Sequence, residues 1–563
     1  MQKRVLLACV MAIVLLSPLN LLAQDDNKVT LRGSLQTEMM IPQVDSVIGA
    51  TDYAGDFLSN TYINLQLTSK YITAGARMEI MDTPLPGFED AFAGSGLTNV
   101  FVTGKYKWFE ITVGDIYDQF GSGLIFRSYE DRPLGIDNSL RGARLVLEPY
   151  KGIRLKGLAG MQRNYFNFNS DNYYGFDYTQ GAVMGGDLEL NIDEWFPAMQ
   201  EKDYRLMLGG SYVSKYDPDE VIQPSALYRL NLPEYVGSAD VRVRFQKGGW
   251  NALAEYAYKA NDPSNDNGYI YKPGNATLLS LTYAERGMSF IVQAKRSDNM
   301  SYRADRTGSG TSGFINHMPA FSMTHTYALA ALYPYATQTQ GEWAYQAEAR
   351  YTFKRKTTLG GKYGTNIRAN ITYVCGLDTT GVTMVNGSYQ GTNGYTTSLF
   401  GHGDETYYLD AHLEVSKKLS KTFSFTAMYM YQQYNQKVIE GHGTNGDIVN
   451  SNIFIFEGKY KHSSNIGMRA ELQYLHTAQD LGDWAYGLYE ISLYKKVLIE
   501  LSDMYNVGTT NQHYYKVAAA YTEGAHRVQL SYGRTRAGYN CSGGVCRYVP
   551  ASKGMSISYF VNF

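Results

Sequence analysis

Apolar and polar residues alternate without a break through the last eleven residues of the chain, 553–563. One face carries Met555, Ile557, Tyr559, Val561 and Phe563, and the other carries Ser556, Ser558, Phe560 and Asn562. A period of two predicts a β-strand with one apolar face. Bacterial outer-membrane β-barrels close on strands of this kind, with the apolar face toward lipid.

The same alternation recurs along most of the chain. It covers residues 63–68, 72–80, 342–353, 423–431 and 466–474. In each segment one face lacks charge and the other is hydrophilic. Strands of about ten residues suit a tilted crossing of a bilayer, whereas the strands of a soluble sandwich are shorter. The pattern therefore predicts an all-β chain that crosses a membrane with strands.

Short and long connections alternate between these strands. The short turns are residues 105–107, 149–151, 246–249, 285–287, 416–421, 495–496 and 523–526. The long polar connections are residues 42–56, 163–180, 216–235, 261–274, 376–404 and 435–450. Outer-membrane barrels have short periplasmic turns and long external loops, so we predict a transmembrane antiparallel β-barrel of roughly 24 strands, within a range of about 20–26.

Three stretches depart from this pattern. Residues 191–202 contain Trp195-Phe196-Pro197 and predict a periplasmic turn with some helix. Residues 121–138 and 297–340 give no strand pairing.

The start of the chain has the three parts of a secretory signal peptide. Lys3 and Arg4 precede an apolar run over residues 5–16, and Leu21-Leu22-Ala23 forms a cleavage site before Gln24. The apolar run is too short for a membrane-spanning helix.

A lipoprotein signal is the alternative, because Leu6-Leu7-Ala8-Cys9 matches its pattern. The apolar core follows Cys9 instead of preceding it, which is the wrong order. We therefore expect residues 1–23 to be removed after export through the periplasm. Residues 24–563 would then form the barrel in the cell outer membrane.

Tyrosine is the compositional outlier, with 49 Tyr against 5 Trp and 23 Phe. A ring with a polar tip suits the membrane–water boundary, where outer-membrane barrels carry aromatic girdles. A Tyr-rich soluble β-sandwich explains this count equally well, but the signal peptide and the terminal strand favour the barrel. The formal net charge of −2 provides no field that would attract nucleic acid.

Two cysteines flank a flexible turn near the end of the chain. Cys541 and Cys546 enclose Ser-Gly-Gly-Val, and in an exported protein we expect them to form a disulfide at a loop tip. A metal-binding cysteine pair is the alternative, although no second pair of ligands lies nearby. Cys375 is left unpaired at the end of a predicted strand.

The stretch over residues 113–144 mixes apolar residues with charges of both signs. Its acidic residues are Asp115, Asp118, Glu130, Asp131 and Asp137, and its arginines are Arg127, Arg132, Arg141 and Arg144. A solvated loop would leave Phe120, Leu124, Ile125 and Phe126 without cover. We therefore expect residues near 114–144 to fold into the lumen, fill it in part and form the main constriction. A plain surface loop is the alternative.

The run over residues 114–142 is similar to porin and alginate-exporter barrels, in which a Gly-containing strand end precedes an Arg-rich constriction and a second Arg-bearing strand. It resembles more closely an uncharacterised family of outer-membrane barrels from Bacteroidota, a domain of unknown function. The last residues, 559–563, fit that family as well. The resemblance implies location and fold and carries no activity.

The end of the chain also resembles the C-terminal signal of outer-membrane barrels, carried here by Tyr559, Val561 and Phe563. That resemblance implies the barrel-assembly machinery as a partner, together with outer-membrane lipids.

Charged residues opposite the apolar faces would line the lumen. Arg144, Arg154, Arg242 and Arg244 give the N-terminal half an excess of positive charge, which would favour anionic solutes. The alternative is that these charges only keep the interior hydrated.

Histidines give no clear chemistry. His412 lies between Asp410 and Glu414 on an inward face, either as a triad-like array or as a polar network of the lumen. The other histidines lack the spacing of metal ligands. We predict no catalytic site, no metal and no cofactor, and hence no enzyme.

Two functions remain at this stage. The first is porin-like passage of small polar or anionic solutes. The second is a closed barrel that acts as a scaffold or receptor for a lipoprotein partner.

Overall fold

The structure is a computed structural model that describes residues 29–88, 93–163, 181–218, 220–224, 226, 228–381, 389–441 and 448–563. The predicted signal peptide, residues 1–23, lies outside the described residues.

Twenty-four strands form one sheet. The first twelve are β1 (Thr30–Pro42), β2 (Leu58–Thr68), β3 (Ile72–Met81), β4 (Gly94–Tyr106), β5 (Phe109–Ile116), β8 (Leu140–Tyr150), β9 (Ile153–Gln162), β10 (Ala182–Asn191), β11 (Tyr204–Tyr216), β12 (Tyr235–Lys247), β13 (Trp250–Lys259) and β14 (Gly274–Glu285). The others are β15 (Met288–Asp298), β16 (Gly341–Phe353), β17 (Thr365–Thr380), β18 (Thr396–Lys418), β19 (Phe423–Asn435), β20 (Ile448–Lys461), β21 (Ile466–His476), β22 (Trp484–Leu493), β23 (Val497–Asn506), β24 (His513–Glu523), β25 (His526–Thr535) and β28 (Ser552–Asn562).

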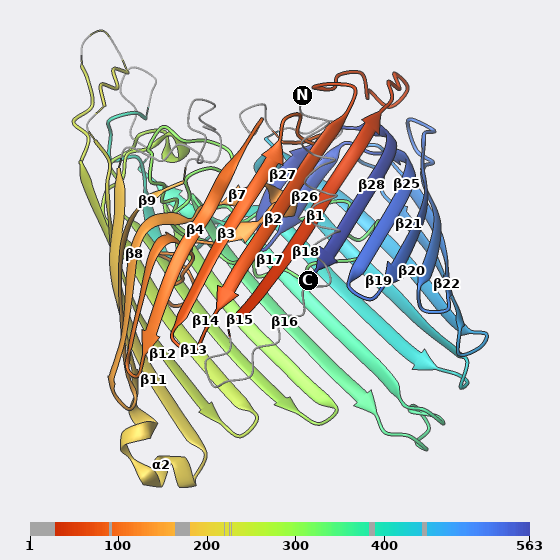
Figure 1. Cartoon of the computed structure of the whole chain (residues 1–563), viewed down its shortest axis with the longest axis horizontal. Helices are drawn as coiled ribbons and strands as arrows, with labels where there is room; N and C mark the ends of the chain where they lie inside the picture. Colours follow the sequence, from red (N-terminus) through yellow and green to blue (C-terminus); the bar gives the residue numbers. More distant parts are fainter. Residues whose placement is uncertain are drawn as a thin grey trace.

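The sheet closes into a barrel (Figure 1). Each strand pairs antiparallel with the next barrel strand along the chain, and β1 pairs with both β2 and β28. Closure gives every strand two neighbours, so the ring leaves no open edge. The predicted all-β transmembrane barrel and its strand number are confirmed.

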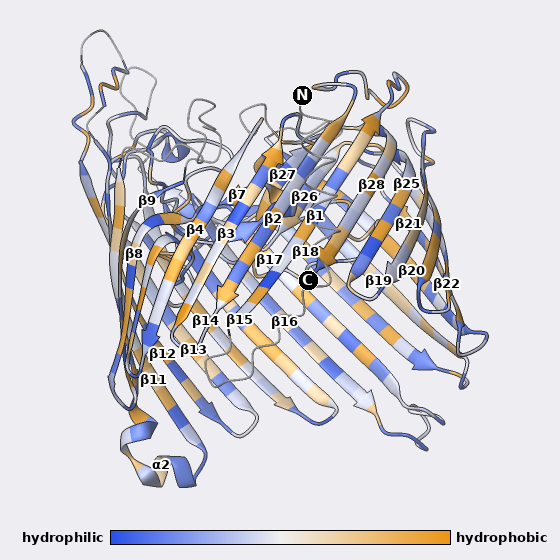
Figure 2. Cartoon of the chain, in the orientation of Figure 1, coloured by the Kyte–Doolittle hydropathy of each residue, from blue (hydrophilic) through white to orange (hydrophobic). Residues whose placement is uncertain are grey.

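Hydrophobic and hydrophilic residues alternate along many of the strands (Figure 2). Along β12, Val241 and Val243 are exposed on the outside, while Asp240 and Arg242 are buried inside. An apolar exterior around a closed ring is the arrangement of a transmembrane β-barrel.

Short turns lie at one end of the barrel and long connections at the other. The predicted short turns all fall between consecutive strands, for example between β4 and β5 and between β22 and β23. We call the two ends the short-turn end and the long-loop end. Thr30 and Phe563 both lie at the short-turn end, because Thr30 pairs with Thr68 and the Phe563 backbone bonds to Gly33.

One predicted long connection is too long. Residues 376–404 were expected to form a loop, but β17 continues to Thr380 and β18 already begins at Thr396. These extensions are rich in Gly, Thr and Asp, and their few apolar residues, Leu377, Leu399 and Phe400, do not give the regular alternation that marks a membrane strand. Cys375 consequently lies inside β17 and not at its end, and it is free and buried.

Helices are few and short within the described residues. They are η2 (Arg132–Leu134), η3 (Ile192–Trp195), α2 (Pro197–Glu201), η4 (Asn265–Asn267) and α3 (Gln436–Ile439). The pair η3 and α2 confirms the helical turn predicted over residues 191–202. Within the described part of the chain, no helix has the length and apolarity needed to cross a membrane.

We predict that the β1–β28 closure depends on Gly33. A Cβ atom added at Gly33 would lie 2.4 Å from the ring of Phe563, so Gly33→Val displaces the final aromatic residue from the closing pair. Gly33→Val and Phe563→Ala should both lower the yield of folded barrel, measured by heat-modifiable mobility. Gly157→Val is the control, because a Cβ atom there meets nothing within 4 Å. Equal yields for Gly33→Val and the control would contradict this role.

We also predict that the short-turn end faces the periplasm. An epitope tag inserted between Thr380 and Thr396 should be labelled on intact cells, because that connection lies at the long-loop end. A tag at Lys495-Lys496 should be labelled only after permeabilisation. The reverse labelling pattern would show that the barrel has the opposite orientation.

Candidate functional site: the filled lumen

Among the connections that the structure describes in full, two fold into the barrel. The first lumen segment, residues 117–139, joins β5 to β8 and contains β6 (Glu130–Asp131), η2 and β7 (Ile136–Asp137). The second lumen segment, residues 299–340, joins β15 to β16. Figure 1 shows chain inside the long-loop half of the barrel, whereas the short-turn end holds mainly strands and turns. The stretch predicted near 114–144 is therefore shorter than expected, since Asp115, Arg141 and Arg144 belong to wall strands.

The two segments share one hydrophobic core inside the barrel. From the first segment, Phe120, Leu124, Ile125 and Phe126 are almost fully buried. From the second segment come Met300, Tyr302, Ile315, Met318, Phe321, Leu329 and Leu332, among others. Apolar inward residues of the wall, such as Val213, Ala344, Val374 and Ile453, complete the core. We call the two segments together the septum.

Backbone hydrogen bonds also join the segments. Arg127 N donates to Ile315 O over 2.8 Å, and His317 N donates to Gly123 O over 2.9 Å. The Asn316 side chain donates to Leu124 O over 3.0 Å. The second segment was missed as a lumen element, because its sequence has no periodicity that separates an inward loop from a surface loop.

A buried charge cluster holds the first segment to β3 and to the residue after β9. Asp137 forms ion pairs with Arg77 and Arg163, which are almost fully buried. Glu79 accepts from Arg163 over 3.1 Å and pairs with Arg77 over 2.9 Å. Glu130 pairs with Arg77 over 2.8 Å. Each buried charge is thus compensated, as burial requires.

A second charge cluster holds the second segment to β11 and the connection after β13. Lys215 Nζ lies 2.8 Å from Asp262 and 3.6 Å from Asp217. Asp217 in turn pairs with Arg306 of the segment over 3.0 Å. Lys215 also donates to the Arg303 carbonyl over 2.8 Å. The segment is therefore anchored to the wall by charged hydrogen bonds.

The arginines predicted in the first segment have different partners. Arg132 pairs with Glu130 over 2.5 Å and donates to Gln36 of β1 over 2.9 Å. Among the described residues Arg127 has no carboxylate at ion-pair distance, and its guanidinium lies 4.3 Å from the ring centroid of Tyr129. Asp131 has a local role instead: its side chain accepts from Leu134 N and caps η2.

Two wall arginines from the prediction face opposite sides. Arg144 faces the lumen and pairs with Glu110 over 2.5 Å and with Asp118 over 3.2 Å. Arg141 pairs with Asp115 over 2.8 Å, but it lies opposite Met161, an exposed residue of the outer face. Asp115 and Arg141 therefore point outward near the long-loop rim and do not line the lumen. The sequence already indicated this orientation, because Arg141 lies two residues before Ala143 and four before Leu145 and therefore shares their outer face of β8.

The short-turn half of the lumen is an open vestibule. Along β12 the inward residues Asp240 and Arg242 are buried by the septum, whereas Arg244 is exposed. Arg242 is neutralised by Asp187 at 2.6 Å and Glu189 at 3.1 Å. A vestibule cavity of about 330 Å³ is lined by both signs of charge: Glu189, Asp193, Glu194, Arg205 and Arg244.

Arg154 also lies in this vestibule, 3.6 Å from Glu148 in an exposed pair. The excess of positive charge predicted for this wall is thus largely paired with carboxylates.

The inward face of the closing strands is covered less than that of β21. We call six polar residues of this face of β25, β28 and β1 the seam strip: Gln529, Ser531, Ser556, Ser558, Gln36 and Glu38. Glu38 is exposed and the other five are half-buried. On β21, by contrast, Glu471, Gln473 and Leu475 are all buried. The septum therefore covers the seam strip less completely than it covers β21.

A disulfide-tipped hairpin lies above the seam strip. β26 (Gly538–Ser542) and β27 (Val545–Val549) form it between β25 and β28, and a disulfide joins Cys541 to Cys546. Its tip reaches the septum, because Thr337 N donates to Gly544 O over 2.9 Å. The predicted cysteine pair therefore lies over the lumen, where it contacts the second segment.

The sequence analysis did not predict a cluster of two histidines and one aspartate inside the barrel. His325 of the second segment lies beside Asp410 and His412 of β18. The inward array at His412 was visible in the sequence, but nothing there indicated His325, which is far away along the chain.

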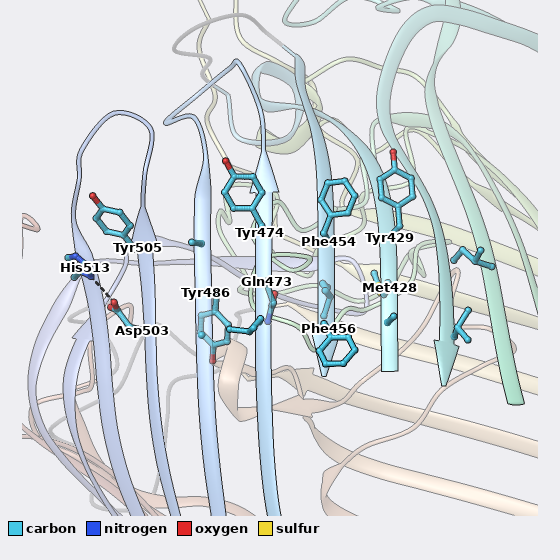
Figure 3. A pocket seen from close by; sticks show the side chains of 17 residues that line it. Met428, Tyr429, Phe454, Phe456, Gln473, Tyr474, Tyr486, Asp503, Tyr505 and His513 are labelled. Atoms are coloured by element: carbon cyan, nitrogen blue, oxygen red, sulfur yellow. Dashed lines mark hydrogen bonds and ion pairs between the residues drawn. The ribbon is translucent and has the colours of Figure 1, made fainter. Parts of the chain in front are cut away.

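A broad groove on the outer wall has a different character (Figure 3). It has a volume of about 940 Å³ and crosses the lipid-facing side of β18 to β24. Figure 3 shows Tyr429, Phe454 and Tyr474 along it, with Tyr505 beside the hydrogen-bonded pair Asp503 and His513 at one edge. Because this groove opens toward lipid, it contributes nothing to a path through the lumen.

Solved structures with similar chains include outer-membrane proteins. The siderophore receptor PirA from Pseudomonas aeruginosa is 10% identical, with 95% of this chain and 80% of that chain covered and a TM-score of 0.41. OccAB3 from Acinetobacter baumannii is 10% identical, with 96% and 100% covered and a TM-score of 0.36. The outer membrane protein OpdK from Pseudomonas aeruginosa is 12% identical, with 84% and 99% covered and a TM-score of 0.34. Similarities this low support no inference about function.

No curated protein matches the chain in sequence. A family model matches all of residues 1–563, and the chain therefore belongs to a family of unknown function, DUF6029.

Proposed function

We propose that the protein conducts small polar solutes across the outer membrane along the seam strip. The supporting observation is the uneven cover of the lumen wall. The inward residues Glu471, Gln473 and Leu475 of β21 are buried, whereas Ser556 and Ser558 are half-buried and Glu38 is exposed. Small hydroxyl side chains and one carboxylate suit a narrow hydrated path.

The proposed solutes are polar, without a strong preference for anions. Arg144 and Arg242 each have two or more carboxylate partners, so little of their positive field reaches the vestibule. Glu38 adds an exposed negative charge on the strip itself. We propose further that solutes enter the strip from the vestibule, which carries both signs of charge.

A closed scaffold or receptor for a lipoprotein partner is the second candidate. It is favoured by the firm anchoring of the septum, whose charged ties at Asp137 and Asp217 are buried. Moving such a septum would expose an apolar core and separate buried ion pairs, and both changes are costly.

We predict that the septum depends on the buried Asp137 cluster. Asp137→Asn leaves Arg77 and Arg163 short of a compensating charge, and loss of one partner of a buried pair costs about 3–5 kcal/mol. Urea unfolding in lipid vesicles should report a loss of this size. The matched control is Glu148→Gln, which alters an exposed pair with Arg154 and should change stability by about 0–1 kcal/mol. Equal effects of the two changes would argue against the cluster as the anchor.

We predict that a bulky side chain on the seam strip blocks conduction. Ser558→Trp places an indole on the inner face of β28, and single-channel conductance in a planar bilayer should fall severalfold. Val528→Trp is the control on the neighbouring strand, because Val528 is exposed on the outer face. Glu38→Lys should in addition shift ion preference from cations toward anions.

Conductance that is identical in wild type and in Ser558→Trp would exclude the strip as the path. A folded, inserted wild-type barrel that never conducts would favour the scaffold candidate.

A further inference from the structure

We propose that His325, Asp410 and His412 form a binding site for a divalent transition-metal ion such as Zn²⁺. His325 comes from the second lumen segment, and the other two residues come from the inward face of β18. His325 Nε2 lies 2.7 Å from Asp410 Oδ2, and His412 Nδ1 lies 2.8 Å from Asp410 Oδ1. One ligand atom from each residue can be chosen such that all three lie within 4.8 Å of one another.

The donor set selects the class of metal. Two imidazole nitrogens and one carboxylate oxygen are ligands of Zn²⁺ and its neighbours in the first transition row. Calcium and magnesium prefer sites made of oxygen alone. Three protein ligands leave a fourth position of a tetrahedral ion for water or a solute.

Burial and charge both favour a cation at this position. The side chains of Asp410 and His412 are fully buried, and that of His325 is 4% exposed. In the described part of the chain, the ion-pair partners of Asp410 are these two imidazoles, with no Lys or Arg among them. With both rings neutral, the cluster carries an uncompensated buried negative charge, which a divalent ion would balance.

A second observation points to a missing partner. Within the described residues, the buried Nε2 atom of His412 has no hydrogen-bond partner. Buried polar atoms are normally satisfied by protein, water or an ion.

Ions can reach the site from the vestibule. His325 lies between Thr324 and Thr326, which are both exposed. Glu414, the next inward residue of β18 toward the short-turn end, is half-buried and pairs with Arg368 over 3.1 Å.

A bound ion would fasten the second segment to the wall at a position distant in sequence, because His325 and Asp410 are 85 residues apart. This inference does not rest on the proposed passage of solutes: the site lies on β18, away from the seam strip, and metal binding is measured without any conductance.

The test is a metal titration of the purified full-length barrel after treatment with a chelator. We expect isothermal calorimetry to detect one Zn²⁺ per chain, and Co²⁺ in its place to give the visible absorption of a tetrahedral site. His325→Ala and His412→Ala should each lower affinity by about tenfold or more, since even residues that only support a metal ligand have effects of this size. His402→Ala, on the same strand outside the cluster, should bind as wild type does.

A second readout follows the segment itself. Zn²⁺ should slow proteolysis within residues 299–340 of wild type and have no such effect in His325→Ala. Folding of each variant is checked by heat-modifiable mobility, and His325→Gln replaces His325→Ala if the latter fails this check. Equal Zn²⁺ binding by wild type and the His325 variant, or no binding by wild type, would overturn the proposal and leave a hydrogen-bonded triad only.

Discussion

The width of a 24-strand ring is the constraint on which the rest of this structure depends. A small barrel fills its interior with wall side chains, but a ring this large encloses more space than they can occupy. The protein fills part of that space with residues 117–139 and 299–340, and a hydrophobic core forms where a wide porin would hold water. The residues of the inner wall match this division: apolar residues such as Val213 and Ile453 lie beside the septum, and charged residues lie beside the vestibule.

The septum buries charged side chains of the barrel wall, and the wall supplies partners that compensate them. Charges that would be hydrated in an open pore become buried once the septum covers them, so each needs a partner. Two buried groups show such pairing: Asp137 lies between Arg77 and Arg163, and Lys215 lies between Asp217 and Asp262. The same pairs that compensate burial also fix the position of the septum. The inward arginines therefore serve more to hold the septum in place than to bind a solute.

Sequence reasoning was most effective where lipid imposes a pattern. The bilayer demands an apolar outer face and a fully paired backbone, so period-two alternation and turn lengths predicted the barrel and its strand number. It was least effective for the segments inside the barrel, because no boundary with lipid imposes a periodic pattern on their sequence. Phe120 and Phe126 indicated an inward segment because they lacked cover, yet residues 299–340 gave no comparable signal. Reading residues 114–144 as one loop also concealed that Arg141 continues the outward parity of β8, and the separation between His325 and Asp410 hid their contact.

The septum covers some strands of the wall more completely than others, and the proposed function depends on this difference. The septum is anchored to β3, β11 and β15 by charged residues, including Arg77, Lys215 and Lys295. On the side of the closing strands, Arg132 of the septum donates a hydrogen bond to Gln36 of β1, and Thr337 N donates to Gly544 O of the hairpin between β25 and β28. Among the described residues, no buried ion pair joins the septum to β25, β28 or β1. A path along this side would separate no buried ion pair, so a filled barrel and a conducting one are compatible. On the anchored side, β18 offers His412 and Asp410 to His325, where an ion would strengthen the hold on the septum without obstructing that path.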